Sequence, residues 1–434
     1  MSKTINIGIA GLGTVGCGVI NNLSRNKENL KEKYDLDYNI LGVSASNKTK
    51  KRSINIEGMS WYDNPLDLAK NKDIDLIIEL VGGEKGIAFD LAIETIKNKK
   101  GFITANKALI STNGKILSEI SSKNDVFFGY EAAVAGGIPI IKTLKSGLFL
   151  DKINDIFGIL NGTSNFILSR MNSANKSFDE ALAEAQELGY AEADPSFDIN
   201  GMDAAHKLSI ISALSFGEFP SLENTNVKGI EKIQTIDHKY ARELGYKIKL
   251  VGKSSLINGK ISKEISPMLV DEDSSLGTVE GVSNVVCINT DYNGTLILEG
   301  EGAGEGPTSA SVLSDIIDFS QGVKSHLFGK SFDDLIDSVS DIEISNRCYY
   351  LRTFLVDQKG SMAKFTSILE KNGISIDQVI QRGGVHLKDE KNSTPVIMLT
   401  HPVDTDSINS AFSELINTDL ISLNPIFLPV LRDN

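Results

Sequence analysis

The stretch INIGIAGLGTVGCGVINNLS, residues 5–24, decides the fold of the amino-terminal part of this chain. Its first six residues are a compact apolar run that predicts a buried parallel strand. In the turn that follows, Gly11 permits the tight bend, Gly13 lets the backbone approach a pyrophosphate, and Gly16 allows close helix–strand packing. The next helix presents free N–H groups to the phosphates. The order of strand, G-x-G-x-x-G and helix therefore predicts a dinucleotide-binding site.

The same alternation of strand and helix continues to about residue 130. We expect strands at 38–46, 73–82, 102–106 and 125–133, with a helix at 88–101. Alternating strands and helices favour a Rossmann-type, doubly wound parallel sheet. We assign residues 1–130 to this NAD(P)-binding domain, and expect the backbone amides of Thr14 and Val15 to add cofactor contacts.

The pattern changes after residue 130. Residues 177–189 predict a helix that Ser177 and Glu180 cap and that Gly189 closes. Short alternating segments between 248 and 300 suit an antiparallel sheet covered by helices. We assign residues 131–330 to a second domain of the α+β class.

The last part of the chain predicts a small separate module. Residues 331–345 are acidic and poorly patterned, as expected of a linker. Residues 346–434 then show the order βαββαβ, which resembles an ACT domain, a module that commonly binds amino-acid effectors.

Composition narrows the class of protein. The 434 residues are 41% hydrophobic and 23% charged, which is typical of a soluble globular protein. A net charge of -13 argues against nucleic acid or an anionic membrane as the main partner. The apolar runs are too short to span a bilayer, and the amino terminus lacks a signal-peptide core. The three cysteines are far apart and the five histidines show no paired spacing, so we expect a cytoplasmic protein without disulfides or a zinc site.

The segment AQELGYAEADPSFDINGMDAAHK, residues 185–207, carries the most chemistry. It contains the carboxylates Glu192, Asp194, Asp198 and Asp203 and ends at Lys207. The following helix places Asp203 and Lys207 on one face, four residues apart. A carboxylate beside a proton-carrying lysine is the minimum for acid/base work on an amino-acid-like substrate. A loop of solvated charges with a surface ion pair would show the same spacing.

The spacing of this segment resembles the signature of homoserine dehydrogenases. Five further segments carry the resemblance over nearly the whole chain: GLGTVG at 11–16, ELVGG at 79–83, TANKAL at 104–109, YEAAVAGGIPI at 130–140 and GILNGTSNFIL at 158–168. The segment GEGAGEGPT, ending at Thr308, matches as well. The resemblance implies reversible hydride transfer between a nicotinamide cofactor and L-aspartate 4-semialdehyde, which gives L-homoserine. It also implies that residues 131–330 form the catalytic and dimerisation domain, and that residues 302–325 pack back onto the nucleotide domain.

The resemblance assigns roles to the charged residues. An ordinary lysine has a pKa of about 10.4 and can donate a proton to the nascent alkoxide. That role falls to Lys207, with Asp203 orienting the lysine or the substrate. Glu192 and Asp198 hold the amino group of the substrate, while Lys107, just past a strand end, lies between cofactor and substrate. Homoserine oxidation should then favour alkaline pH.

Two loops of small residues complete the expected site. Gly302 and Gly304 are expected to let the backbone approach the nicotinamide end of the cofactor, or they form only a glycine-rich turn before the helix at Thr308. The family also implies a monovalent cation, sodium-like, which suits oxygen donors on an irregular loop. Its ligands, carried over by position, are Glu131, Val134, Gly136 and Ile138, and its role is to fix a loop.

The preference between NADP and NAD stays open. The second strand ends in LGVSASNKTKKR, residues 41–52, without a carboxylate for the ribose 2′-hydroxyl. The basic side chains Lys48, Lys50, Lys51 and Arg52 suit a 2′-phosphate, or they form a solvated loop. Relatives often carry an arginine where Ser46 stands.

Two other functions compete with this interpretation. An acylating semialdehyde dehydrogenase needs a cysteine nucleophile with a nearby base, and neither Cys287 nor Cys348 stands at a convincing strand exit or helix start. A nucleotide-binding sensor gated by the terminal module would bind cofactor without turnover. We expect a monofunctional homodimer or homotetramer, with threonine as a possible effector.

Overall fold

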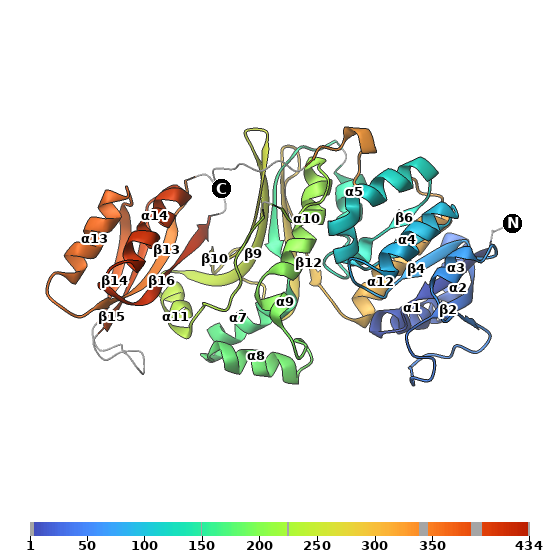
Figure 1. Cartoon of the computed structure of the whole chain (residues 1–434), viewed down its shortest axis with the longest axis horizontal. Helices are drawn as coiled ribbons and strands as arrows, with labels where there is room; N and C mark the ends of the chain where they lie inside the picture. The colour runs from blue at the N-terminus through green and yellow to red at the C-terminus, as the bar shows by residue number, and fades with distance from the viewer. Residues whose placement is uncertain (1–3, 149, 224, 338–345, 383–392, 433–434) are drawn as a thin grey trace.

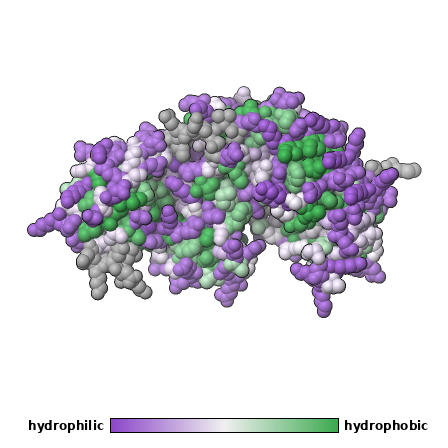
Figure 2. Space-filling model, in the orientation of Figure 1, coloured by the Kyte–Doolittle hydropathy of each residue, from purple (hydrophilic) through white to green (hydrophobic). Residues whose placement is uncertain are grey.

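The computed structural model describes residues 4–148, 150–223, 225–337, 346–382 and 393–432. Figure 1 shows its three parts in a row, with the amino-terminal sheet at one end and the carboxyl-terminal unit at the other. On the face seen in Figure 2, hydrophobic areas occur in all three parts and are bordered by hydrophilic side chains. No helix among the described residues is both long and apolar enough to cross a bilayer.

The amino-terminal sheet has six parallel strands in the order β3-β2-β1-β4-β5-β6, which confirms the predicted fold. The strands are β1 (Thr4–Ala10), β2 (Asp37–Ser44), β3 (Ser60–Trp61), β4 (Leu76–Glu79), β5 (Gly101–Thr104) and β6 (Phe128–Gly129). The strand order reverses between β1 and β4. In open α/β sheets, ligands bind outside the carboxyl ends of the strands at such a reversal.

Helices cover both faces of this sheet. They are α1 (Thr14–Arg25), α2 (Lys27–Tyr34), α3 (Leu66–Lys70), α4 (Ile87–Lys97), α5 (Lys107–Asn124) and α12 (Glu305–Ser320). Alternate residues of β4 belong to different cores: Leu76 and Ile78 pack with α1 and α12, whereas Ile77 packs with α4 and α5. This alternation follows from the two-residue period of a strand. Helix α12 therefore returns to the nucleotide part from far along the chain, and Asn22 of α1 donates a hydrogen bond to Ser309 at 2.6 Å.

The central sheet is antiparallel over its long strands, as predicted. It contains β7 (Ile153–Ile159), β9 (Tyr246–Ile257), β10 (Lys260–Asp271), β11 (Ser283–Thr290) and β12 (Gly294–Glu301), and β8 (Thr225–Val227) pairs parallel with β10. Its helical elements are α6 (Ile140–Lys142), α7 (Gly162–Ala174), α8 (Phe178–Glu187), α9 (Ser196–Ile199), α10 (Met202–Phe216) and α11 (Thr235–Glu243). The predicted capping box of Ser177 and Glu180 opens α8. A π-helical turn (Thr143–Gly147) extends α6.

The carboxyl-terminal unit has the predicted order βαββαβ. Its elements are β13 (Tyr349–Val356), α13 (Ser361–Lys371), β14 (Ile376–Gln381), β15 (Ser393–Thr400), α14 (Thr405–Ile416) and β16 (Ile421–Leu431). Strand β16 pairs parallel with β10 through Leu269 with Val430 and Val270 with Leu431. This pairing joins the unit to the central sheet, a continuity that the sequence did not predict.

Three local expectations differ from the structure. The strand expected at 125–133 is reduced to the two residues of β6, because Asp125 adopts a left-handed conformation (φ 50°) that ends α5, and Glu131–Ala133 form a 3₁₀ turn. Helix α5 itself, which begins at Lys107, was not predicted. Part of the expected linker is ordered, since Ile336 bridges to Glu218; residues 338–345 of it lie outside the described residues.

A buried ion pair connects the carboxyl-terminal unit to α11. Arg352 of β13 lies with its Nε atom 2.8 Å from Oδ1 of Asp237, and their side chains are 2% and 0% exposed. Tyr350 donates a second bond to Asp237 at 3.0 Å. Burial raises the pKa of Asp237, while Arg352 and the hydrogen bonds oppose the rise.

Replacing one partner of this pair should destabilise the protein. Asp237→Ala leaves the Arg352 guanidinium buried and uncompensated, which costs about 3–5 kcal/mol. We expect that loss in the free energy of unfolding measured with urea. The matched control is Glu414→Ala, because the Lys371–Glu414 pair of the same unit is 3.0 Å long but exposed and should contribute almost nothing. Equal losses for the two variants would contradict a structural role for the buried pair.

Candidate active site

One buried carboxylate joins the two lysines that the sequence singled out. Asp203 accepts from Lys207 Nζ at 2.7 Å through Oδ2, and its Oδ1 lies 3.0 Å from Lys107 Nζ. The side chains of Asp203, Lys207 and Lys107 are 6%, 11% and 32% exposed. Lys207 also donates to the carbonyl oxygen of Leu160 at 2.8 Å. Among the described residues, two of its three N–H donors thus have partners, which leaves one for a substrate oxygen.

The local fold explains why Asp203 lies where it does. Gly201 has a left-handed backbone (φ 87°) and precedes α10, so Asp203 falls in the first turn and Lys207 one turn later. The positive end of a helix dipole favours a carboxylate in the first turn. Burial by itself would raise the pKa of Asp203, but Lys207, Lys107 and the hydrogen bond from Asn161 outweigh burial and hold the pKa far below its ordinary value.

Asn161 is a site residue that sequence reasoning missed. Its side-chain Nδ2 donates to Asp198 and to Asp203, both at 2.7 Å, while its Oδ1 caps α7 by accepting from Ser164. Asp198, on α9, is thereby held beside Asp203. Burial raises the pKa of Asp198, and the bond from Asn161 opposes the rise. The available signal was its place in GILNGTSN, where an asparagine before Gly-Thr-Ser suits a helix cap.

Glu192 does not join this cluster. Its side chain is exposed in the segment between α8 and α9. Its backbone carbonyl accepts a hydrogen bond from Gln186 at 3.1 Å. The structure therefore brings Lys107, Lys207, Asp203 and Asp198 together and leaves Glu192 outside their hydrogen bonds.

A polar network places Lys107 at the start of α5. The carboxylate of Glu79, fully buried at the end of β4, accepts from the amides of Val81 and Gly82 and from the hydroxyl of Thr104 at 2.6–2.9 Å. Asn106 caps α5 by accepting from the Leu109 amide at 3.0 Å. Asn106 also donates to the carbonyl of Gly83 at 2.7 Å. These bonds fix the turn from which Lys107 projects.

The glycine turn has the geometry that its sequence predicts. Gly11 has a φ of 102°, and a Cβ there would lie 2.3 Å from the carbonyl oxygen of Leu80. A Cβ on Gly16 would lie 2.0 Å from the Gly11 oxygen, whereas a Cβ on Gly13 would meet nothing within 4 Å. The turn follows β1, and Lys107 follows β5, two strands away in the same parallel sheet. Both therefore lie at the carboxyl edge, where a dinucleotide can reach them.

The two small-residue loops contact each other. A Cβ on Gly136 would lie 2.5 Å from the carbonyl carbon of Gly302, so only glycine permits this approach. Gly304 has a φ of 116° just before α12. Gly137 donates to the carbonyl of Glu301 at 3.0 Å, which fixes the loop that carries Gly302.

The residues expected to bind a cation lie on an irregular buried loop. Ala135 and Gly136 both have a φ of 54°. The Glu131 carboxylate accepts hydrogen bonds from the amides of Ile141 and Lys142, both at 2.9 Å. The carbonyl oxygen of Gly136 accepts a hydrogen bond from the Ser311 hydroxyl. The carbonyl oxygen of Ile138 accepts one from the amide of Ile140. Val134 is fully buried. Burial raises the pKa of Glu131, and the two amides oppose the rise. Within the described residues no group of three His, Cys, Asp or Glu side chains is placed to hold a metal.

The basic loop after β2 folds back onto the glycine turn. Arg52 donates from Nε to the carbonyl oxygen of Leu12 at 3.3 Å and from its terminal nitrogens to the carbonyls of Asn47 and Lys50. Its guanidinium lies over the Trp61 ring, 5.7 Å from the centroid. Arg52 is therefore held beside the glycine turn.

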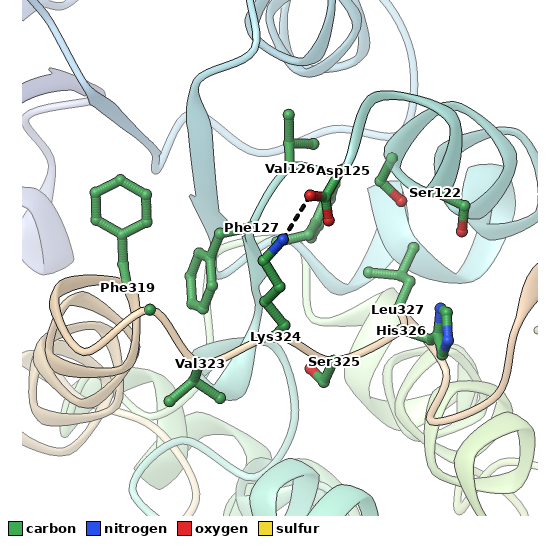
Figure 3. A pocket seen from close by; sticks show the side chains of 13 residues that line it. Ser122, Asp125, Val126, Phe127, Phe319, Val323, Lys324, Ser325, His326 and Leu327 are labelled. Carbon is green, nitrogen blue, oxygen red and sulfur yellow. Dashed lines mark hydrogen bonds and ion pairs between the residues drawn. The ribbon is translucent and has the colours of Figure 1, made fainter.

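A cavity of about 450 Å³ lies elsewhere. Figure 3 shows it beside the amino end of β6, lined by Phe127, Phe319, Val323 and the Asp125–Lys324 ion pair. None of the predicted site residues lines it. Because ligands of parallel sheets gather at the opposite edge, this cavity does not enter the site.

Comparisons with known proteins agree with this geometry. Family models described as "Homoserine dehydrogenase, NAD binding domain" and "Homoserine dehydrogenase" match residues 11–131 and 139–317. The chain is 37% identical to the homoserine dehydrogenase of Neisseria gonorrhoeae, over 96% of this chain and 97% of that protein. The crystal structure of the Thiobacillus denitrificans homoserine dehydrogenase matches with a TM-score of 0.90 and 36% identity, covering 99% and 98% of the two chains. A hyperthermophilic archaeal homoserine dehydrogenase in complex with NADPH matches with a TM-score of 0.64 and 26% identity, covering 75% of this chain and 100% of that one.

Two glycine substitutions should separate folding from dinucleotide binding. Gly16→Ala forces a methyl group against the Gly11 carbonyl and should cost about 1–3 kcal/mol of stability. In Gly13→Ala the added methyl group meets no atom within 4 Å, and the φ of -79° at this position suits alanine. The melting temperature of this variant should therefore not change. The methyl group should nevertheless keep a pyrophosphate from the backbone and weaken binding of NADPH and NADH in fluorescence titrations. Normal affinity in the Gly13→Ala protein would contradict the assigned cofactor position.

Proposed function

The chain belongs to the homoserine dehydrogenase family of oxidoreductases, and we propose that it interconverts L-aspartate 4-semialdehyde and L-homoserine, in the branch of the aspartate pathway that leads to threonine, methionine and isoleucine. The observation that carries this proposal is the pair of lysines held by Asp203 at the carboxyl edge of the nucleotide-binding sheet. One lysine comes from each of the two parts of the chain that would enclose the substrate.

Lys207 is the proton donor and acceptor of the proposed reaction. Its ammonium has one N–H free of protein partners among the described residues and can protonate the alkoxide oxygen that forms from the aldehyde. The bound nicotinamide cofactor supplies the hydride, or accepts it in the reverse direction. Oxidation of homoserine releases a proton, so it should be favoured as the pH rises.

The neighbouring carboxylates and Lys107 orient the substrate. Asp203 fixes the ammonium groups of Lys207 and Lys107, and Lys107 polarises the reacting oxygen. Asp198 is held by Asn161 near the same point and suits the amino group of the substrate. Glu192 is proposed as the second group on that amino group; its exposed position requires the segment between α8 and α9 to close over the substrate.

NADP is the proposed cofactor, with NAD as the alternative. The backbone of Gly11, Gly13, Thr14, Val15 and Gly16 would hold the pyrophosphate, and Gly302 and Gly304 the nicotinamide end. Arg52 lies beside the glycine turn with its charge uncompensated by any ion pair among the described residues, which suits a 2′-phosphate. The similarity to an archaeal homoserine dehydrogenase that binds NADPH supports the same choice.

A monovalent cation, sodium by its oxygen donors, is proposed for the loop next to the nicotinamide end. Its ligands would be main-chain oxygens of Glu131, Val134, Gly136 and Ile138. The consecutive left-handed residues in this loop and its contact with Gly302 support a role in holding the loop's shape.

The proposed domains follow the three parts of the chain. They are residues 1–130 completed by 302–325, residues 131–330, and residues 346–434. The last, an ACT-like unit, would bind an amino-acid effector such as threonine, and the enzyme would act as a homodimer or homotetramer.

The competing functions have less support. Cys287 and Cys348 are both buried, at 0% and 5% exposure, so neither offers a thiol to an aldehyde substrate. A sensor without turnover would have no need of a lysine pair at the cofactor edge. Loss of NADPH absorbance at 340 nm with aspartate semialdehyde separates an enzyme from a sensor.

Replacing Lys207 tests its catalytic role. Lys207→Ala should lower kcat by about 10²–10⁴-fold, because the proton donor is lost, while the Kd for NADPH stays the same. Lys123→Ala is the matched control: Lys123 also pairs with a carboxylate four residues away, at 2.5 Å, but on the exposed end of α5. A kcat near that of the unaltered enzyme in the Lys207→Ala protein would remove Lys207 from this role.

Replacing Arg52 tests the cofactor preference. Arg52→Gln should raise the Kd for NADPH about 10- to 150-fold, because a charge-assisted bond to the 2′-phosphate contributes about 1.5–3 kcal/mol. The Kd for NADH should change little, which makes NADH the internal control. If the Kd values for NADPH and NADH rise by the same factor, Arg52 only shapes the glycine turn and does not bind the phosphate.

A further inference from the structure

A buried hydrogen bond links the two helices that carry the lysines. Ser111 Oγ of α5 lies 2.5 Å from His206 Nδ1 of α10. The two residues are 2% and 5% exposed. Neither residue belongs to the expected site, and the proposed proton transfer uses neither of them.

The position of this bond relates it directly to the lysine cluster. Ser111 lies four residues after Lys107, so it shares the same face of α5 one turn further on. His206 immediately precedes Lys207 and lies three residues after Asp203. The ion pair between Lys107 and Asp203 and the bond between Ser111 and His206 therefore cross the same helix–helix junction one turn apart.

Phe197 packs against both sides of this junction. Its ring centroid lies 5.4 Å from that of the His206 imidazole and 5.8 Å from Lys107 Nζ. The imidazole thus has a hydrogen-bond partner on one edge and an aromatic ring against it, which leaves it little freedom to turn. A fixed imidazole holds Ser111, and with it the first turns of α5.

Burial favours the neutral form of the His206 imidazole. Burial lowers its pKa, and Lys107 lowers it further, while Asp203 and Glu84 act in the opposite direction. A cationic His206 would add a third positive charge to this junction and repel the two lysines. A neutral ring can bond Ser111 without disturbing the ion pairs of Asp203.

We propose that Ser111 and His206 are positioning residues, whose hydrogen bond fixes Lys107 on the nucleotide-binding part against Asp203 and Lys207 on the catalytic part. This inference rests on the proposed reaction. Its physical basis is that α5 follows β5 of the first sheet whereas α10 packs on the second, so covalent structure alone does not set the distance between their lysines. Small misplacements of a reacting group cost large factors in rate.

The experiment compares four variants of the full-length enzyme. Ser111→Ala and His206→Leu remove the bond, and each should lower kcat about tenfold. The KM for aspartate semialdehyde and the Kd for NADPH should change less than twofold, because Asp198 and the glycine turn are untouched. His206→Asn keeps a hydrogen-bonding atom near the Nδ1 position and should restore most of the kcat that His206→Leu loses. Ser118→Ala is the matched control, since Ser118 is a buried serine of the same helix whose hydroxyl has no partner among the described residues.

Each result decides the matter. An unaltered kcat in Ser111→Ala, the same loss in Ser118→Ala, or equal activities of His206→Asn and His206→Leu would overturn the positioning role. Melting temperatures measured in parallel show whether a variant has lost its fold. If His206→Leu is unstable, Ser111→Ala and Ser118→Ala still test the bond, and His206→Asn should then keep most of the kcat of the unaltered enzyme. If the unaltered protein does not turn over homoserine or the semialdehyde, the proposed function fails instead.

Discussion

The burial of Asp203 is the constraint on which the arrangement of this site depends. A carboxylate removed from water is costly unless charges and hydrogen bonds compensate it. Here the compensating charges are those of Lys207, on the same helix as Asp203, and of Lys107, on α5 of the nucleotide-binding part. Folding of the catalytic part is therefore linked to correct docking of the nucleotide-binding part. The same electrostatic requirement that stabilises the junction places two ammonium groups where a substrate oxygen is expected.

Other buried polar groups near the junction follow the same rule. Glu79 is satisfied by two amides and a hydroxyl, and Asn161 donates to two carboxylates at once. Each of these groups ends a strand or begins a helix, where backbone N–H groups are free to be bonded. Polar side chains at element ends thus do two things: they complete the local fold, and they fix the direction in which Lys107 and Asp203 point.

Local patterns in the sequence predicted the parts of the site that lie within one element. The glycine turn and the spacing of Asp203 from Lys207 are examples, since helix and strand periods determine them. The bond of Ser111 to His206 and the contact of Gly136 with Gly302 join residues 95 and more positions apart. No local periodicity encodes such contacts, and only the docking of whole elements brings them together. The shortened strand at β6 was missed for a related reason, because a left-handed Asp125 leaves no periodic signal.

Two residue pairs between β16 and β10 make the carboxyl-terminal unit continuous with the central sheet. Its sequence predicts a module after a linker, yet β16 pairs with β10 at Leu269 and Val270. Four residues earlier, Ile265 of β10 packs against Gly201, where a Cβ would lie 3.1 Å from its Cγ2 atom. Gly201 is the residue from which α10 and Asp203 begin. One strand therefore contacts both the terminal unit and the start of α10, so the same backbone links the position of that unit to the position of Asp203.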